Sequence, residues 1–396
     1  MINKQEMSKK RSISLFYLLI LVIIMLVGLG LSALFSASYD KAMRLGLDPD
    51  YFFTRQLVYA VGGIAAACAA FFLPKKFLRF VTPFLILASL ILMLLTLLTS
   101  LGETRLGARR WIQLGPVGFQ PSELVKICAI FFLANYFDKH QSKLKFFSAN
   151  IYPAAVVLIF SGLILLQRDY STALIFTAIC FFLFIAAGTR FYYLFYMLTF
   201  VGVPGLLILL TETYRLKRVV GFIFKDIDPA GLNYQVNASL AAIKAGGLTG
   251  KGLGNGIYKL GRLPEVQSDF IFASFMEENG FFGGSLVIIL FGLLAYAGYR
   301  GSSRLRESDP YLYFLGFGIT SIIIWQALLN IGVVTGIVPP TGIPLPFFSQ
   351  GGTSLLVNIG MSGLLCKVIY RAEIHNPDSK NKTISQNTSY QEVLYE

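Results

Sequence analysis

Long apolar runs alternate with short polar connections along most of this chain. At roughly 17–25 residues, each run is long enough for a helix that crosses a bilayer. Only helices and closed barrels satisfy every backbone group in lipid, and the unbroken runs exclude a barrel. The pattern therefore predicts an all-α, polytopic integral membrane protein with about ten transmembrane helices. The predicted spans cover residues 14–37, 56–74, 78–100, 122–137, 151–167, 170–187, 192–211, 270–297, 311–335 and 351–370.

The polar segments divide the chain into regions. We expect residues 1–13 to form a cytoplasmic N-terminal segment, residues 14–371 the transmembrane domain, and residues 372–396 a disordered cytoplasmic tail. The first apolar run, Ile13 to about Phe35, is too long for the core of a signal peptide, so we expect it to remain as the first span. A long extracytoplasmic loop, about residues 212–269, separates spans 7 and 8.

Charge orients the spans and raises a question about the outer face. Only 14% of the residues are charged, against 55% that are hydrophobic, and the formal net charge is +13. Lysine and arginine clusters in the short loops fall on one side, which predicts that both termini are cytoplasmic. The outer loops carry many cations as well. Either long loops translocate regardless of charge, or the outer face binds an anion such as a phosphate or pyrophosphate headgroup.

Cysteine and histidine usage indicates no metal centre. All four cysteines lie inside apolar runs, where cysteine packs as a small hydrophobic side chain, and they show no metal-ligand spacing. The two histidines are isolated in short basic segments. The sequence therefore predicts neither a metal site built by protein ligands nor a disulfide framework.

The first charged outer loop leads into the fourth span. Arg109 and Arg110 lie among glycines and prolines, which favour a structured turn rather than a helix. Glu123 and Lys126 follow, three positions apart, and they face one another if the helix has begun. Charges at this depth are functional by default. A structural ion pair that pins the helix is the alternative.

A second outer connection, Gln167–Tyr170, carries opposite charges on the neighbouring residues Arg168 and Asp169. Adjacent opposite charges at a tight connection are typical of a solvated turn. They also suit a functional site, and the sequence leaves the two interpretations open.

The long outer loop combines a helical pattern with a glycine-rich run. Val236, Leu240 and Ile243 recur at helical spacing within residues 233–245, which predicts a short amphipathic helix on the membrane surface. The glycine-rich run that follows, residues 246–256, does not have the spacing of a nucleotide-binding P-loop. Its backbone amides can form an anion nest, and a mobile hinge is the alternative.

Asp269 stands directly before the eighth apolar run. Partial burial there should raise its pKa and make it a better general base. Ser268 and Asp269 are equally suitable as N-caps for the helix that follows. Glu277 and Glu278 lie about two turns deeper, and we expect one of them to face the bundle interior and pair with a cation such as Lys126.

The last outer loop, residues 338–352, is rich in proline, which forbids a helix and makes the loop rigid. It is mostly uncharged and apolar. The sequence therefore predicts either a rigid lid over a lipid-chain groove or a structural plug.

Four motifs together resemble the SEDS family of bacterial shape, elongation, division and sporulation proteins, which includes FtsW, RodA and SpoVE. The resemblance runs from about Phe16 to Arg371 and is closest to the FtsW and SpoVE cell-division type. The motifs are GARRWIQLG with QPSELVK, AGGLTGKGLGNG, LPEVQSDFIFASFMEENGF and PPTGIPLPFFSQGGTS. Three positions depart from the family pattern: Gln267-Ser268 replace His-Thr, Gln350 replaces Tyr, and QRDYST replaces QPDLGT.

The resemblance implies a peptidoglycan glycosyltransferase that polymerises lipid II at the outer membrane face. The essential acid of the family corresponds to Asp269, which we expect to act as general base while undecaprenyl pyrophosphate leaves with inversion. Outer-loop cations would stabilise that leaving group, and Mg²⁺ or Mn²⁺ can share the role because pyrophosphate recruits divalent cations. The expected substrate-binding residues are Arg109, Arg110, Glu123, Lys126, Lys251, Lys259, Glu277 and Ser349.

The family also implies partners and a location. We expect a class B penicillin-binding protein, which is a transpeptidase, and other division-complex membrane proteins at the septum of the bacterial inner (plasma) membrane. No nucleic-acid partner is expected. The alternative function is a lipid II flippase, which needs polar groups continuing to the inner face; the predicted spans carry few there. A scaffold without catalysis would leave the outer cations without a purpose.

Overall fold

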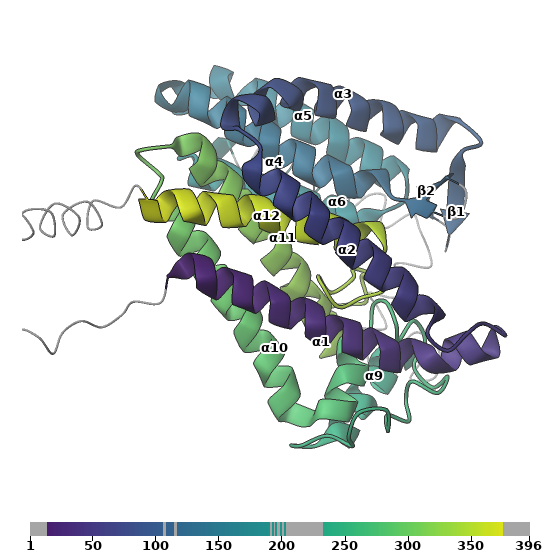
Figure 1. The fold of residues 1–396 in the computed structure, drawn as a ribbon. Coiled ribbons are helices and arrows are strands. Elements are labelled where there is room, and N and C mark those ends of the chain that lie inside the picture. The colour runs from purple at the N-terminus through teal and green to yellow at the C-terminus, as the bar shows by residue number, and fades with distance from the viewer. Residues whose placement is uncertain are drawn as a thin grey trace, which may run out of the picture.

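The computed structural model describes residues 14–105, 108–114, 117–190 and 233–374, together with residues 192, 193, 195, 199 and 202. It is a bundle of long helices with one small sheet (Figure 1). The helices are α1 (Leu15–Arg44), α2 (Tyr51–Phe72), α3 (Lys75–Leu98), α4 (Pro121–His140), α5 (Phe147–Leu166), α6 (Tyr170–Ala186), α9 (Tyr234–Gly246), α10 (Ile271–Ser303), α11 (Pro310–Val334) and α12 (Thr353–Ile374), with the 3-10 helix η2 (Gln141–Lys143).

The predicted helical membrane fold is confirmed. Seven of the described helices are long and apolar enough to cross a bilayer: α1, α2, α3, α5, α10, α11 and α12. Helix α4 matches the fourth predicted span but carries Glu123 and Lys126 near its start, and α6 matches the sixth with 17 residues. The predicted span 192–211 lies almost wholly outside the described residues, as do residues 1–13 and 212–232.

Both ends of the described chain lie at one end of the bundle. Ser14 Oγ donates a hydrogen bond to Glu373 Oε2 at 2.6 Å, and the ring centroids of Phe16 and Tyr370 are 5.5 Å apart. The sheet and α9 lie toward the opposite end, at the right of Figure 1. This arrangement agrees with the even number of membrane crossings that the sequence predicts. Helix α12 continues to Ile374, so the prediction that disorder begins at residue 372 is wrong for its first residues.

Small residues allow α12 to pack closely on α2. A Cβ atom added to Gly363 would lie 2.2 Å from the carbonyl oxygen of Ala67, and one on Gly63 would lie 3.0 Å from the side chain of Ile359. Glycine at these positions lets the two backbones approach, which is a common basis of helix packing in membranes.

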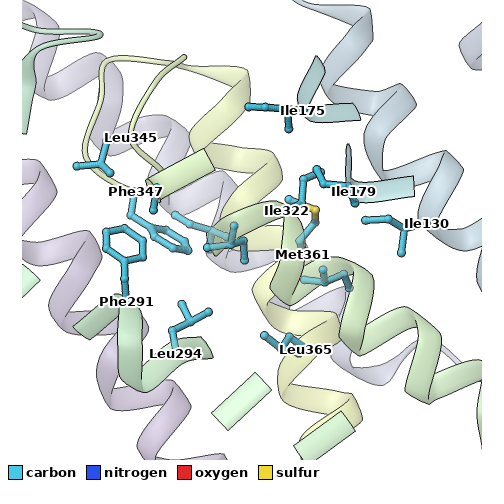
Figure 2. Packing of buried hydrophobic residues seen from close by; sticks show 14 of the residues in the cluster. Ile130, Ile175, Ile179, Phe291, Leu294, Ile322, Leu345, Phe347, Met361 and Leu365 are labelled. Atoms are coloured by element: carbon cyan, nitrogen blue, oxygen red, sulfur yellow. The ribbon is translucent and has the colours of Figure 1, made fainter. Parts of the chain in front are cut away.

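The apolar core surrounds α11 and α12. Figure 2 shows Ile130, Ile179, Ile322 and Met361, which come from α4, α6, α11 and α12, gathered in one region. On the other side of the same core, Phe291 and Leu294 of α10 lie beside Leu345 and Phe347 of the loop that follows α11 (Figure 2). The core therefore fixes the proline-rich loop to the bundle.

A small antiparallel sheet lies between α3 and α4, where the sequence predicted only a structured turn. Its strands are β1 (Gly102–Arg105), β2 (Ala108–Leu114) and β3 (Val117–Phe119), in the order β1-β2-β3. Trp111 pairs with Glu103 on one side of β2, and Ile112 pairs with Phe119 on the other. The sheet fixes Arg109 and Arg110 on a rigid strand.

Candidate active site

A cavity of about 210 Å³ lies at the sheet end of the bundle. Its walls come from β2, the first turns of α4, α6 and α12, the segment before α10, and the loop after α11. Stretches that are far apart in the sequence therefore meet here. The charged residues that line the cavity are Arg110, Glu123, Lys126, Glu265 and Asp269.

Asp269 lines this cavity and is half-buried, as its place in the sequence predicted. The predicted capping role is wrong: helix α10 begins at Ile271, so the N-cap position falls on Phe270. Ser268 Oγ instead bonds to the Glu265 side chain at 3.0 Å. A Cβ atom on Gly342 would lie 3.4 Å from Asp269 Oδ2. The carboxylate therefore faces the proline-rich loop, and the raised pKa stays a prediction.

Glu123 and Lys126 form a buried ion pair in the cavity wall. Lys126 Nζ lies 2.8 Å from Glu123 Oε1, and the side chains are only 2% and 6% exposed. The predicted contact between them, one turn apart on α4, is confirmed. Their mutual neutralisation makes burial of both charges tolerable. The predicted pairing of Lys126 with Glu277 or Glu278 is wrong, because both glutamates bind other lysines.

Arg110 reaches the cavity and bonds to Asp169. The distance from Arg110 Nη1 to Asp169 Oδ2 is 3.1 Å, and the Asp169 side chain is 2% exposed. Asp169 also caps α6 through the backbone N–H of Thr172 and accepts a hydrogen bond from Gln120 Nε2 at 3.1 Å. Asp169 is therefore a buried residue that binds Arg110, Gln120 and the start of α6, and the interpretation of this connection as a solvated turn is wrong. The sequence signal for it was an aspartate directly before an apolar helical run.

Arg109 points away from the cavity. Its guanidinium donates hydrogen bonds to the carbonyl oxygens of Thr99 at 2.5 Å and Gly102 at 3.3 Å. These carbonyls follow the end of α3, where backbone acceptors lack helical partners. The backbone N–H of Arg109 donates to the carbonyl of Gln167 at 3.1 Å. Arg109 thus connects three segments, and its neighbour Arg110 is the cation that faces the cavity.

The backbone N–H groups that bind a carboxylate, that of Glu277, follow the glycine-rich run directly, so the predicted anion nest falls on residues 257–258 and not on residues 246–256. The Glu277 side chain is fully buried and accepts hydrogen bonds from the backbone N–H groups of Ile257 at 2.8 Å and Tyr258 at 3.1 Å. Lys251 Nζ completes the site at 2.7 Å. Backbone bonds from Lys251 to Glu277 and from Phe281 to Gly247 fasten the run to α10, where Gly280 breaks the helix with φ 65° and ψ −166°.

Lys259 and Glu278 form a second buried pair beside the nest. Lys259 Nζ lies 2.6 Å from Glu278 Oε1, and Ser36 Oγ of α1 donates to the same carboxylate oxygen at 2.6 Å. This pair ties the loop to α1 as well as α10. Neither these residues nor Lys251 and Glu277 line the cavity.

The predicted short helix in the long loop is confirmed as α9, but its packed face differs. The buried positions include Val236, Ser239 and Ala242, and Ser239 Oγ donates to the carbonyl of Val334 at 2.8 Å. Leu240 is 37% exposed. Helix α9 therefore packs on α10 and the end of α11 through small residues. Its place on the membrane surface stays a prediction.

Ser349 holds the proline-rich loop in place behind the cavity. It is 4% exposed, and its hydroxyl donates to the carbonyl of Ser268 at 2.5 Å and accepts from the N–H of Leu345 at 2.8 Å. The neighbouring Gln350 and Gly351 line the cavity, as do residues 342–344 of the same loop. The loop therefore forms a fixed wall of the cavity, and the rigid lid and the structural plug both stay predictions.

Residues 16–374 match the family model described as Cell cycle protein, which covers FtsW, RodA and SpoVE. This chain belongs to that family. The probable peptidoglycan glycosyltransferase FtsW of Coxiella burnetii is 36% identical over 371 residues, which cover 93% of this chain and 100% of that protein. Stage V sporulation protein E of Bacillus subtilis is 36% identical, over 89% of this chain and 96% of that protein.

Solved structures of the family share the fold. A chain from a peptidoglycan synthase complex, described as coordinating polymerization and crosslinking, has a TM-score of 0.72 at 27% identity and covers 89% of this chain and 97% of that one. The rod shape determining protein RodA of Thermus thermophilus has a TM-score of 0.64 at 26% identity, over 89% and 95% of the two chains. This chain is thus a multi-pass membrane protein of the FtsW/RodA/SpoVE family.

Three of the four family motifs meet at the cavity and one does not. Arg110 with Glu123, Asp269, and Gln350 come from three of them. The glycine-rich motif lies outside the cavity, where its Lys251 binds Glu277 of α10. Among the residues that the structure describes, no group of three or more histidine, cysteine or acidic side chains is placed to hold a metal ion. A divalent cation carried by the substrate stays a prediction.

Proposed function

We propose that this protein is a peptidoglycan glycosyltransferase that polymerises lipid II into glycan strands at the outer face of the bacterial plasma membrane. The observation that carries the proposal is the half-buried Asp269, which lines one cavity with the cations Arg110 and Lys126. A base and a cation in one cavity are what a transfer from a pyrophosphate carrier requires. The names of the FtsW relatives support the same activity.

In this reaction Asp269 accepts the proton of the GlcNAc 4-hydroxyl of the acceptor lipid II. The oxygen forms a bond to the anomeric carbon of MurNAc at the reducing end of the growing strand. The bond from that carbon to undecaprenyl pyrophosphate breaks, and the configuration inverts from α to β. Arg110 is placed to stabilise the negative charge on the leaving pyrophosphate, because its planar guanidinium matches phosphate oxygens.

The roles of the remaining predicted residues follow from where they lie. Glu123 and Lys126 line the cavity as a neutral pair, which suits hydrogen bonding to the polar headgroup. Arg109 and Ser349 act behind the cavity by holding segments that form it. Lys251, Lys259 and Glu277 fix the glycine-rich run to α10 and α1, outside the cavity. Any assistance by Mg²⁺ or Mn²⁺ would come with the pyrophosphate of the substrate.

The distribution of buried charge favours the enzyme over a flippase. In the described part of the chain, the buried charged residues are Glu123, Lys126, Asp169, Lys259, Glu277, Glu278 and Lys367. All except Lys367 belong to the cavity end or to the loop beside it. A path for a charged headgroup would need such charged groups to continue through the other half of the bundle, where, apart from that lysine, the described buried polar residues are small and uncharged, such as Thr320, Ser321 and Ser362.

We further propose that the protein works beside a class B penicillin-binding protein at the division septum, with both termini in the cytoplasm. The neighbour from a complex that coordinates polymerization and crosslinking supports such a partner. Other division-complex membrane proteins would be recruited to the same place, where crosslinking can follow polymerisation directly.

The test is reconstitution of the protein with its class B partner in proteoliposomes that contain purified lipid II. Glycan strands are separated by gel electrophoresis, and the leaflet of the remaining lipid II is measured with a membrane-impermeant reagent. We expect strands from the wild type and none from Asp269→Asn at equal folded yield. Movement of lipid II between leaflets without strands in either case would support the flippase instead.

A further inference from the structure

Two irregular segments build the wall of the cavity that contains Asp269. One is the segment before α10, and the other is the loop after α11. Neither is held by a helix or a strand ladder. The backbone N–H of Gln350 donates to the carbonyl of Gln267 at 2.8 Å, and Ser349 Oγ donates to the carbonyl of Ser268 at 2.5 Å. The core packing of Leu345 and Phe347 holds the loop in the bundle, and single hydrogen bonds join it to the segment before α10.

Asn330 of α11 contacts the backbone of Asp269 itself. Its Nδ2 donates one hydrogen bond to the backbone carbonyl of Asp269 at 2.8 Å and a second to the backbone carbonyl of Ile343 at 2.8 Å. The amide has two N–H groups, and each one holds a different segment. One side chain on a regular helix thus fixes both walls of the cavity at the position of Asp269.

The surroundings of Asn330 indicate that stability alone does not explain it. The residue is 1% exposed, and its Oδ1 has no hydrogen-bond partner in the described part of the chain. A buried amide with an unsatisfied oxygen costs free energy that an apolar side chain would not. Most positions around it on α11 are apolar, in agreement with a membrane helix. The two hydrogen bonds to the carbonyls of Asp269 and Ile343 therefore explain why an asparagine occupies this position.

We propose that Asn330 is a positioning residue that sets the placement of the Asp269 carboxylate. The inference rests on the proposed function, in which Asp269 is the general base. Because the carbonyl and the carboxylate belong to the same residue, the bond to the carbonyl restricts the backbone from which the carboxylate projects. The bond to Ile343 fixes the opposite wall beside Gly342, where an added Cβ atom would lie 3.4 Å from Asp269 Oδ2. Asn330 itself does not line the cavity.

The experiment compares kcat and KM of lipid II polymerisation for Asn330→Ala and Asn330→Asp in the full protein with its partner. Asn150 on α5 offers a matched control: it is 3% exposed, and its Nδ2 also donates to two backbone carbonyls, those of Leu144 and Phe146, each at 2.8 Å and outside the cavity. Asn150→Ala and Asn150→Asp therefore report the loss of a buried amide that holds two carbonyls, without the loss of a bond to the cavity wall.

We expect Asn330→Ala to lower kcat by about 10- to 100-fold, because a misplacement of about 1 Å costs roughly that much. KM and the Kd for lipid II should stay within about twofold of the wild-type values. Asn150→Ala should lower Tm by an amount similar to that of Asn330→Ala and leave kcat within about threefold of the wild type. Asn330→Asp retains the shape of the side chain, so it keeps the test valid if the alanine variant folds poorly.

Equal kcat for the Asn330 and Asn150 variants at equal Tm overturns the inference, as does a rise in KM at unchanged kcat. The wild type and Asp269→Asn are measured in the same series. Strands from the wild type that do not depend on Asp269 would contradict the proposed function. Strands that depend on Asp269 but not on Asn330 would contradict only the positioning role.

Discussion

Glu277 is the carboxylate on which the glycine-rich loop is fixed, and Glu277→Ala removes that support. The side chain is fully buried and accepts two backbone N–H bonds as well as the bond from Lys251. In the alanine variant the N–H groups of Ile257 and Tyr258 lose their acceptor. Lys251 also loses its partner, but its side chain is 28% exposed, so water can hydrate the ammonium group and this loss contributes less.

The magnitude follows from these contacts. Each lost hydrogen bond to the charged carboxylate costs about 1.5–3 kcal/mol, so the two backbone bonds together cost about 3–6 kcal/mol. Removal of one partner from a buried ion pair typically costs about 3–5 kcal/mol, which falls within the same range. Glu277→Gln keeps an oxygen acceptor and should lose about half as much.

Hydrogen exchange measured by mass spectrometry in detergent locates this loss. We expect amides within residues 246–260 to exchange at least about 100-fold faster in Glu277→Ala, because about 3 kcal/mol corresponds to two powers of ten. Glu373→Gln is the control at the far end of the bundle, where Glu373 accepts from Ser14. Loop amides that exchange at the wild-type rate in Glu277→Ala would refute the structural role of this carboxylate.

Two further predictions each compare a residue with a control residue of the same type, on the same strand or the same helix. Arg110→Lys keeps a charge beside Asp169 but loses the planar fork, so we expect kcat/KM for polymerisation to fall about 10-fold with Tm unchanged. Arg109→Lys loses bonds to the end of α3, so Tm should fall while kcat/KM stays constant; the reverse pattern would exchange the two roles. Gly280→Ala should prevent folding, measured as monodisperse yield, because its Cβ would lie 2.3 Å from Gly250 N, whereas Gly292→Ala on the same helix meets nothing within 4 Å and should fold normally.

Much of the fold is predictable because membrane helices can be identified in a sequence by their length and apolarity. The positions of α10 and α11 follow from their apolar runs, and the Glu123–Lys126 pair follows from helical spacing. Asp269 could be singled out because a carboxylate at the boundary of an apolar run is costly. These are local signals, and each one is contained within a few turns of one helix.

The contacts that hold the site together depend on long-range geometry. Lys251 meets Glu277 because Gly280 breaks α10 and the loop folds back on it, and no local pattern encodes that pairing. Likewise, Arg109 and Arg110 have the same charge, and only alternation along β2 sends one to α3 and the other to the cavity. Asn330 carries no sequence signal beyond being polar in an apolar helix.

In the proposed function Asp269 acts as a base in a cavity that binds lipid II. The most direct measurement is the rate of strand formation by Asp269→Asn at saturating lipid II, with bound lipid II measured on the same sample. We expect lipid II to bind within a few-fold of the wild-type Kd while the rate falls by at least about 100-fold, as removal of a general base requires. A rate near that of the wild type, at equal occupancy, would contradict this role.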